Sequence, residues 1–395
     1  MKRCSELLEA APNGWVMEYY VGKDYSLGGI TLLCKFDGQR VTMASQIAGA
    51  DETVSSLYSV KSEQATMLSF DTYNYLVHYF GQPQGSMADD PNGTLGGDYE
   101  FVISDATADR IELKGKKYGN RIVMKAFSAD QTWKQYLTRI KKVEDDAFFY
   151  EYDLRMDGLY TGQMLRSNYT FIVTYYDEVG KVHQKTVPFM FTTDGMRFHE
   201  PVTIDGQTMQ NFVWKNEEIS FVCTDEGATE VKLAGVYTAG YQSYDYYPGT
   251  YQMDFYRLND ATNQMEVASQ EIQLVKDEDG KSYWLKGLEY DILVTYDKPR
   301  GGLSILPQFL KKVQGGYVYL AMWDLMNDYV LRSSAIGLIS YPTTDGIYLV
   351  DNGVWMGEIS GFIFGVYDSQ DEEASFMGYT DAVAAIRLIK KTIEE

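Results

Sequence analysis

Tyrosine is unusually frequent in this sequence and limits the folds that the chain can adopt. The chain has 33 tyrosines among 395 residues, but only 3 histidines and 3 cysteines. Tyrosine favours β-strands, where its ring packs against apolar neighbours while its hydroxyl group stays in water. The residue types that most often bind transition metals or act as nucleophiles and bases are scarce. This composition indicates a β-rich binding or surface protein more than an enzyme.

Short strand-like runs follow one another through most of the sequence. They are bounded by Gly, Asp, Asn or Pro, and links such as Asp37-Gly38 and Gly119-Asn120 are typical of hairpin turns. In the first half, strands are predicted at residues 15–21, 29–36, 40–45, 57–60, 66–72, 99–104, 110–113, 121–127, 148–156, 168–176, 182–191 and 218–222. In the second half, they are predicted at 230–237, 250–258, 270–275, 290–296, 303–306, 317–322 and 335–340.

Two or three helices interrupt this pattern. The first is expected over residues 2–11. The second is an amphipathic helix near 129–145, with a capping box at Ser128–Gln131 and an apolar stripe of Trp133, Leu137, Ile140 and Val143. A third helix is expected to begin at Thr380 and to run through Ile389, with Val383 and Ile386 among its apolar positions.

The predicted fold is therefore all-β and mainly antiparallel, with two tandem β-barrel-like or β-sandwich-like domains. A composition shift near residues 224–228 places the N-terminal domain at 1–225, with the helix near 129–145 capping it, and the C-terminal domain at 229–395, ending in a helix. The turn sequence Thr-Thr-Asp-Gly occurs at 192–195 and again at 343–346. It indicates either that the two halves are repeats or that both use a common turn.

Charge excludes several kinds of partner. The formal net charge of −21 repels nucleic acid and anionic lipid headgroups. No run of 18 apolar residues occurs, and the polar start Met1–Glu6 has no signal-peptide core, so either the protein is cytoplasmic or a leader has been removed from this sequence. Cys34 and Cys223 lie within apolar runs and are expected to be buried free thiols.

Several local sequences in the first third resemble a known family. They are Ala11-Pro12-Asn13-Gly14-Trp15, Gly28-Gly29, residues 68–74 followed by His78, residues 96–101, and residues 113–117. Together they resemble a family of Bacteroidota envelope lipoproteins known only as a domain of unknown function, over about residues 5–125 and onward to about 225. The resemblance implies an exported lipoprotein encoded near a SusC/SusD-type outer-membrane uptake pair. It implies no catalytic or binding residues, and Cys4 lacks the apolar segment that precedes a lipid-bearing cysteine.

The densest candidate site is a group of tyrosines that follows the predicted domain boundary. Flat amphipathic rings can stack on sugar faces or planar ligands, so we interpret this group as a ligand-binding platform. The alternative is that the rings pack over the protein's own core. The proposed platform residues are Tyr241, Tyr244, Tyr246, Tyr247 and Tyr251.

Other candidates favour structural roles. His78 lies among aromatic residues, which suits either a haem ligand or, by preference, a hydrogen-bonded histidine in an aromatic core. His183 and His199 are expected on a strand and a loop at the surface. The acidic segments 89–98 and 277–280 could offer oxygen ligands to Ca²⁺ but are better explained as turns. No catalytic motif, metal site or cofactor site is predicted.

The sequence therefore predicts a non-enzymatic lipoprotein of the cell envelope, in the periplasm or at the outer-membrane surface. It is expected to bind a ligand such as a glycan, peptide or porphyrin, or to assist an outer-membrane nutrient-uptake complex. Nucleic acid is not an expected partner, and membrane contact is expected only through a lipid anchor absent from this chain. Two alternatives stay open: a glycan hydrolase that uses paired carboxylates, and a structural or adhesive surface module.

Overall fold

The computed structural model describes residues 2–62, 65–82, 94–177, 179–259, 261–262, 264–371 and 373–391. The chain forms two compact units, Met1–Val236 and Tyr237–Glu395. The predicted all-β, mainly antiparallel fold is confirmed, with three α-helices in the described part of the chain. Residues 89–93 of the acidic segment discussed above lie outside the described residues.

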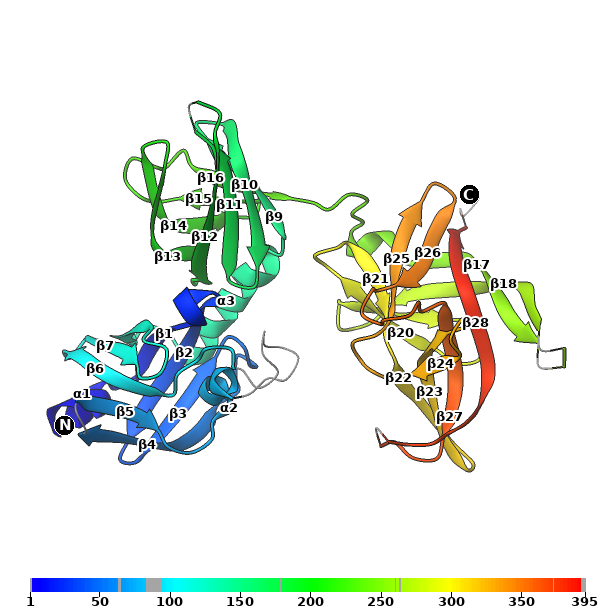
Figure 1. Ribbon diagram of the computed structural model, residues 1–395, viewed down its shortest axis with the longest axis horizontal. Coiled ribbons are helices and arrows are strands. Elements are labelled where there is room, and N and C mark those ends of the chain that lie inside the picture. Colours follow the sequence, from blue (N-terminus) through cyan, green and yellow to red (C-terminus); the bar gives the residue numbers. More distant parts are fainter. Residues whose placement is uncertain are drawn as a thin grey trace. The chain divides into compact units, whose positions relative to one another are not determined.

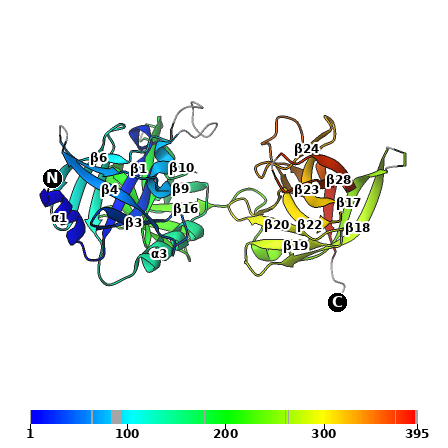
Figure 2. The ribbon, with the colours of Figure 1, turned by 90° about the horizontal axis from the view of Figure 1, so that it is seen from below.

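The first unit begins with a closed eight-stranded barrel in which each strand pairs with the next and β8 returns to β1. Alternate residues of each strand point inward, so that Trp15, Met17 and Tyr19 of β1 are fully buried in the barrel core. Helix α1 (Lys2–Ala10) covers one end, where Leu8 joins the core and its carbonyl accepts a hydrogen bond from the Trp15 indole (Figure 2). The strands are β1 (Trp15–Val21), β2 (Gly28–Asp37), β3 (Arg40–Ser45), β4 (Val54–Ser62), β5 (Thr66–Phe70), β6 (Glu100–Ala106), β7 (Arg110–Gly115) and β8 (Arg121–Ala126), with the short helix α2 (Tyr75–His78) between β5 and β6.

A second closed barrel completes the first unit. Its strands also follow chain order, and β16 closes the ring by pairing with β9. Its core is rich in phenylalanine, with Phe171 and Phe189 stacked 4.5 Å apart. The strands are β9 (Glu151–Met156), β10 (Leu159–Ser167), β11 (Thr170–Tyr176), β12 (Val182–Phe191), β13 (Gly195–Ile204), β14 (Gln207–Lys215), β15 (Ser220–Cys223) and β16 (Lys232–Val236).

Helix α3 (Trp133–Asp146) lies between the two barrels of the first unit (Figure 1). Leu137 packs with residues on the outside of the first barrel, and Ile140 and Val143 belong to the core of the second. The predicted apolar stripe is thus confirmed at these three positions. The capping box lies at Thr132 and Gln135 and not at Ser128–Gln131, because Thr132 is the residue whose side chain accepts from the helix backbone.

The two barrels also touch directly. Gly28 of β2 has a φ of +72°, and a Cβ atom there would lie 1.9 Å from the Tyr169 carbonyl oxygen of the second barrel. The Tyr169 ring packs against the cores of both barrels. The Gly28-Gly29 pair seen in the sequence therefore allows a close approach between barrels, which only a residue without a side chain permits.

The second unit is a single branched sheet with its own core. Its last strand, β28, pairs with both β26 and β17, so the chain of pairings from β17 through β21, β25, β26 and β28 closes into a ring. Strands β27, β23 and β22 extend the sheet beyond β28, and β24 pairs with β23. The bounds are β17 (Gly249–Asn259), β18 (Gln264–Lys276), β19 (Ser282–Lys286), β20 (Ile292–Asp297), β21 (Gly302–Ile305), β22 (Gln308–Val313), β23 (Gly316–Asp324), β24 (Tyr329–Leu331), β25 (Leu338–Thr343), β26 (Gly346–Asp351), β27 (Gly361–Tyr367) and β28 (Phe376–Lys390).

The predicted C-terminal helix is wrong. Residues 380–389 belong to strand β28, in which Val383, Ile386 and Leu388 are buried in the main core of the unit. A bulge at Ala385, whose φ is +50°, shifts the alternation of the preceding residues. Pairing along both edges of the strand overrides the helix propensity of the alanine-rich segment.

The units divide at Val236, later than the predicted change between residues 225 and 229. The reason is that β16 (Lys232–Val236) is needed to close the second barrel. The two Thr-Thr-Asp-Gly sequences form the same kind of hairpin turn, between β12 and β13 and between β25 and β26. In each turn the first threonine hydroxyl donates to the aspartate, Asp194 or Asp345.

Candidate functional site

Two of the five predicted platform tyrosines lie inside the second unit and not on its surface. Tyr247 and Tyr251 are 1% and 0% exposed. Their hydroxyl groups donate to the carbonyl oxygens of Gly301 and Tyr247, at 2.8 and 2.7 Å. The prediction is wrong for these two residues, because their rings fill the core of the unit and cannot stack on a ligand.

The other three tyrosines are half-buried or exposed. Tyr244 stacks on Tyr283 at 4.7 Å and donates to the Ser282 carbonyl oxygen. Tyr241 is half-buried, and Tyr246 is 40% exposed with the Lys390 ammonium group over its ring. A ligand-binding role for Tyr241, Tyr244 and Tyr246 stays a prediction.

The histidines also have defined surroundings. His78 stacks on Tyr99 at 4.7 Å, and its Nδ1 atom lies 3.1 Å from the Asn74 backbone nitrogen, as preferred for a hydrogen-bonded histidine among aromatic rings. His183 lies on β12 beside Asp177, as expected for a strand surface. His199 was expected on a surface loop but lies half-buried on β13.

His199 borders a groove between the two barrels of the first unit, with a volume of about 470 Å³. We call it the inter-barrel groove. The first barrel contributes residues from the outer face of β1, β7 and β8 and from the turn after β1, namely Glu18, Tyr20, Tyr25, Arg110, Arg121, Val123 and Lys125. The second barrel contributes Arg197, His199, Glu200, Gln210 and Asn211, all from β13 and β14.

Tyr20 forms part of the floor of the inter-barrel groove. It is paired with Gly29 on β2, and a Cβ atom at Gly29 would lie only 2.7 Å from the Tyr20 ring, so the ring can lie over this position only because glycine is there. Asn120 fixes the backbone by donating to the Tyr20 carbonyl oxygen at 3.2 Å. Tyr20 is only 4% exposed, and its hydroxyl group has no hydrogen-bond acceptor among the described residues.

His199 lies against two tyrosine rings, with ring centroids 4.3 Å from Tyr20 and 4.0 Å from Tyr25. Tyr25 has a φ of +61°, a left-handed conformation that bulky residues rarely adopt. On the second barrel, the β13–β14 pairing is interrupted between Arg197 and Val202. Bulges of this kind redirect side chains, and here Arg197 and His199 both face the first barrel.

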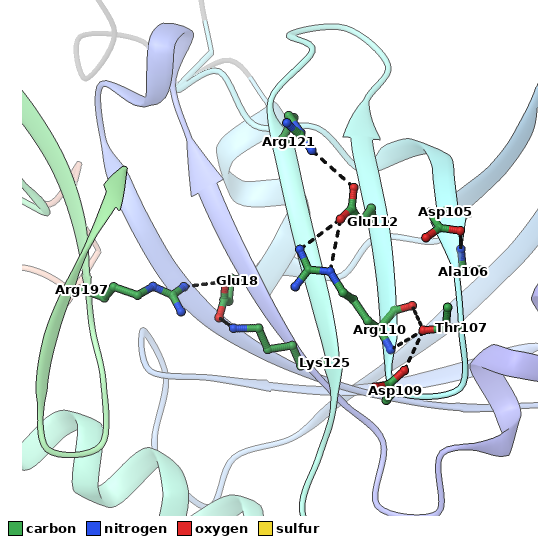
Figure 3. Close-up of polar contacts among 10 residues, drawn as sticks. All are labelled: Glu18, Asp105, Ala106, Thr107, Asp109, Arg110, Glu112, Arg121, Lys125 and Arg197. Atoms are coloured by element: carbon green, nitrogen blue, oxygen red, sulfur yellow. Dashed lines mark hydrogen bonds and ion pairs between the residues drawn. The ribbon is translucent and has the colours of Figure 1, made fainter. Parts of the chain in front are cut away.

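An ion-pair network crosses the groove (Figure 3). The Glu18 carboxylate lies 2.6 Å from the Arg197 guanidinium of the second barrel and 2.6 Å from the Lys125 ammonium group. Burial alone would raise the pKa of Glu18, but Arg197 and Lys125 outweigh burial and lower it. Glu18 is therefore an ionised carboxylate that joins the two barrels.

Further cations stand along the first barrel. Arg110 and Arg121 both contact Glu112, at 3.1 and 3.4 Å, and Figure 3 shows this group beside the Glu18 network. The groove lining holds four cationic side chains but only two carboxylates, Glu18 and Glu200. Burial lowers the pKa of His199, which is therefore neutral near pH 7. The groove is thus locally cationic in a chain whose formal net charge is −21.

The arrangement provides hydrogen-bond donors and no obvious nucleophile. The guanidinium groups present planar pairs of donors, and burial raises the pKa of Tyr20, so its hydroxyl group keeps its proton. Within the described residues, no group of three or more His, Cys, Asp or Glu side chains is placed to hold a metal ion. No helix among them is long and apolar enough to cross a membrane.

Sequence reasoning missed the groove, although part of its signal was present. Strand 121–127 was predicted, and its alternate residues Arg121, Val123 and Lys125 had to share one face. The Gly28-Gly29 pair is also visible in the sequence. The missing step was the approach of β13 from the second barrel, because nothing local in the sequence places Arg197 beside Glu18, which is 179 positions earlier.

Comparisons with known proteins give families but no activity. Residues 1–216 match the model of DUF4302, a domain of unknown function, and residues 224–363 match DUF4987, another domain of unknown function. No curated protein matches the chain.

Similar solved structures include a protein of unknown function from the DUF3598 family of Nostoc punctiforme, with 8% identity, a TM-score of 0.16, and coverage of 62% of this chain and 98% of that one. A second is intact Ap-TbpB with its N and C lobes, with 11% identity, a TM-score of 0.13, and coverage of 92% and 67%. A third is the DNA polymerase III beta chain of Streptococcus pneumoniae, with 8% identity, a TM-score of 0.12, and coverage of 98% and 96%. At these TM-scores the likenesses support no conclusion about fold or function.

Proposed function

Because this chain belongs to the DUF4302 family, a domain of unknown function, we propose a function from its own residues: it is a non-enzymatic ligand-binding protein of the bacterial cell envelope. The ligand seat is the inter-barrel groove. Because its N-terminal third resembles Bacteroidota envelope lipoproteins, we further propose that the protein is a lipoprotein of this kind and that it assists a SusC/SusD-type outer-membrane uptake pair. The acidic, tyrosine-rich composition supports a soluble protein that binds neutral ligands or ligands whose charge complements the binding site.

The buried Tyr20 hydroxyl group is the observation that carries this proposal. A buried hydroxyl without an acceptor costs free energy, and most such groups in folded proteins have a partner. Here the unpaired donor belongs to a residue in the floor of a groove of about 470 Å³ that two barrels form together. A ligand that supplies an acceptor would remove this cost, which favours a binding site over a merely structural crevice.

Hydrolysis is the activity to test against binding, because two carboxylates line the groove. A glycoside hydrolase needs one carboxyl group that is protonated and able to act as a general acid. Glu18 does not fit this role, because two cations hold it ionised. Turnover of oligosaccharides that is lost in Glu200→Gln would overturn the non-enzymatic assignment.

The binding proposal is tested by blocking the groove. Val123 lines it from β8, and Val123→Trp is expected to fill the space, whereas Val182→Trp places the same ring at a 54% exposed position outside the groove. A panel of glycans, peptides and porphyrins is titrated against the full chain by calorimetry. At least one ligand is expected to bind the wild type and Val182→Trp but not Val123→Trp. The proposal fails if no panel member binds, or if both variants bind equally well.

A further inference from the structure

We infer that the inter-barrel groove binds an oxyanion, namely a carboxylate, phosphate or sulfate group of its ligand. This inference rests on the proposed function and adds the chemical class of the ligand. The charge of the groove lining is the first reason. Four cations and two carboxylates line it, and Glu112 pairs with Arg110 and Arg121 from outside the lining, while acidic residues outnumber basic ones 56 to 35 in the whole chain. The net charge of the chain repels anions, whereas cations outnumber carboxylates in the groove lining, so an anion can be held there.

The second reason is the direction of the available hydrogen bonds. The Tyr20 hydroxyl group needs an acceptor, and its charged neighbour Arg197 carries only donors. A group that only donates, such as an ammonium ion, would leave this hydroxyl unpaired. An oxyanion oxygen accepts from the hydroxyl and from a guanidinium group at once, and charge-assisted bonds of this kind are the stronger ones.

The third reason is that the donors are already held in place. Gly29 and Asn120 fix Tyr20, and the interruption of the β13–β14 pairing turns Arg197 toward the first barrel. Arg197 is itself fixed by Glu18, so little side-chain freedom is lost on binding. Donors that are ordered before the ligand arrives favour affinity for small, rigid groups such as oxyanions.

The effect of Glu18 distinguishes oxyanion binding from a purely structural role of the groove residues. Its carboxylate takes part of the hydrogen-bonding capacity of Arg197 and Lys125, and it repels any second anion nearby. A bound oxyanion uses the donors of Arg197 that Glu18 leaves open. Removing the charge of Glu18 should therefore strengthen anion binding, although the same change removes two ion pairs from the fold.

The first test uses Tyr20→Phe, which deletes a hydroxyl group that has no acceptor among the described residues, so that no hydrogen bond donated by this group is lost from the fold. Tyr160→Phe is the matched control, because Tyr160 is 55% exposed and outside the groove. Inorganic phosphate, sulfate and glucuronate are titrated at constant ionic strength, with glucose as the neutral control. At least one anion is expected to bind the wild type and the control equally, and Tyr20→Phe about tenfold to a hundredfold more weakly. Glucose is expected not to bind.

The second test uses Glu18→Gln, for which the inference predicts about tenfold tighter anion binding. If this variant is unstable without ligand, the same prediction is read from thermal unfolding, where phosphate should raise its midpoint more than that of the wild type. Weaker anion binding in Glu18→Gln, or equal affinity in the wild type and Tyr20→Phe, would overturn the inference.

The outcomes also separate this inference from the proposed function. If a neutral ligand of the wider panel binds and Val123→Trp abolishes it, but none of the three anions binds, the groove is a ligand site for another class and only the oxyanion inference fails. If no anion and no panel ligand depends on the groove, both fail. Preference for glucuronate, phosphate or sulfate identifies the group that the ligand carries.

Discussion

The contact between Gly28 and Tyr169 leads to a quantitative prediction about how the two barrels of the first unit are joined. Gly28 has a φ of +72°, and a Cβ atom there would lie 1.9 Å from the Tyr169 carbonyl oxygen, well inside the 3.4 Å at which ordinary contact begins. Gly28→Ala therefore incurs two costs. The left-handed conformation costs alanine about 1–2 kcal/mol, and the forced separation of the barrels adds about 1–3 kcal/mol, as in other overpacked sites.

Gly38→Ala separates these two costs. Gly38 has a similar φ of +60° in the turn between β2 and β3, but nothing lies within 4 Å of the added Cβ atom. This control should lose only about 1–2 kcal/mol, from backbone strain. The difference between the variants, about 1–3 kcal/mol, then measures the contact between barrels.

The assay is urea unfolding of the full chain, followed by circular dichroism and by proteolysis of the first unit. Gly28→Ala is expected to have the lower unfolding midpoint and to expose the segment around Tyr169 to protease before global unfolding. Equal midpoints for the two variants would refute the reasoning, because they would mean that the barrels meet without a close contact at Gly28.

The remaining predictions concern acid stability, thiol reactivity and one buried carboxylate. Neighbouring cations lower the pKa of Glu18 below its ordinary value of 4.5, so its ion pairs stabilise the fold fully above about pH 4.5 and less as the pH falls further. In urea titrations from pH 7 to pH 3, Glu18→Gln should therefore lose less stability at acid pH than the wild type. An equal loss in both proteins would contradict this prediction. Burial raises the pKa of Cys34 and Cys223. Ellman's reagent at pH 8 is therefore expected to react only with Cys4 until the protein is unfolded. Reaction of all three cysteines in the native state would disprove the burial of Cys34 and Cys223. Asp324, the last residue of β23, is 0% exposed and accepts hydrogen bonds from an indole and two amide groups. Asp324→Asn should therefore lower the unfolding midpoint of the second unit, while Asp328→Asn, in the exposed turn that follows β23, should not. A reversed order would count against this account.

The fold class could be predicted because strand signals are local. The predicted bounds of the strands at 15–21 and 40–45 agree with β1 and β3, since alternation and flanking turn residues mark both ends. The C-terminal helix failed for the opposite reason. Residues 380–389 have helix-forming composition, and their strand conformation comes from pairing with β17 and β27, which are distant in sequence.

The number of barrels was equally hard to predict. The second barrel closes when β16 pairs with β9, about 80 positions earlier, and no local pattern encodes that pairing. The groove has one part that local sequence predicts and one part that depends on contacts between residues distant in sequence. The outward face of β8 with Arg121 and Lys125 follows from alternation, but its meeting with Arg197 depends on how two closed barrels pack. The tyrosine platform failed in part because Tyr251 has the same composition signal whether its ring faces solvent or the core.

The central claim is that Tyr20 and Arg197 together hold an oxyanion between the barrels. Diffraction from crystals of the full chain soaked in selenate tests this most directly, because selenium locates the anion by anomalous scattering. We predict an anomalous peak in the inter-barrel groove, with selenate oxygens within hydrogen-bonding distance of the Tyr20 hydroxyl group and the Arg197 guanidinium. Selenate bound only at other basic residues, with this groove empty, would contradict the claim.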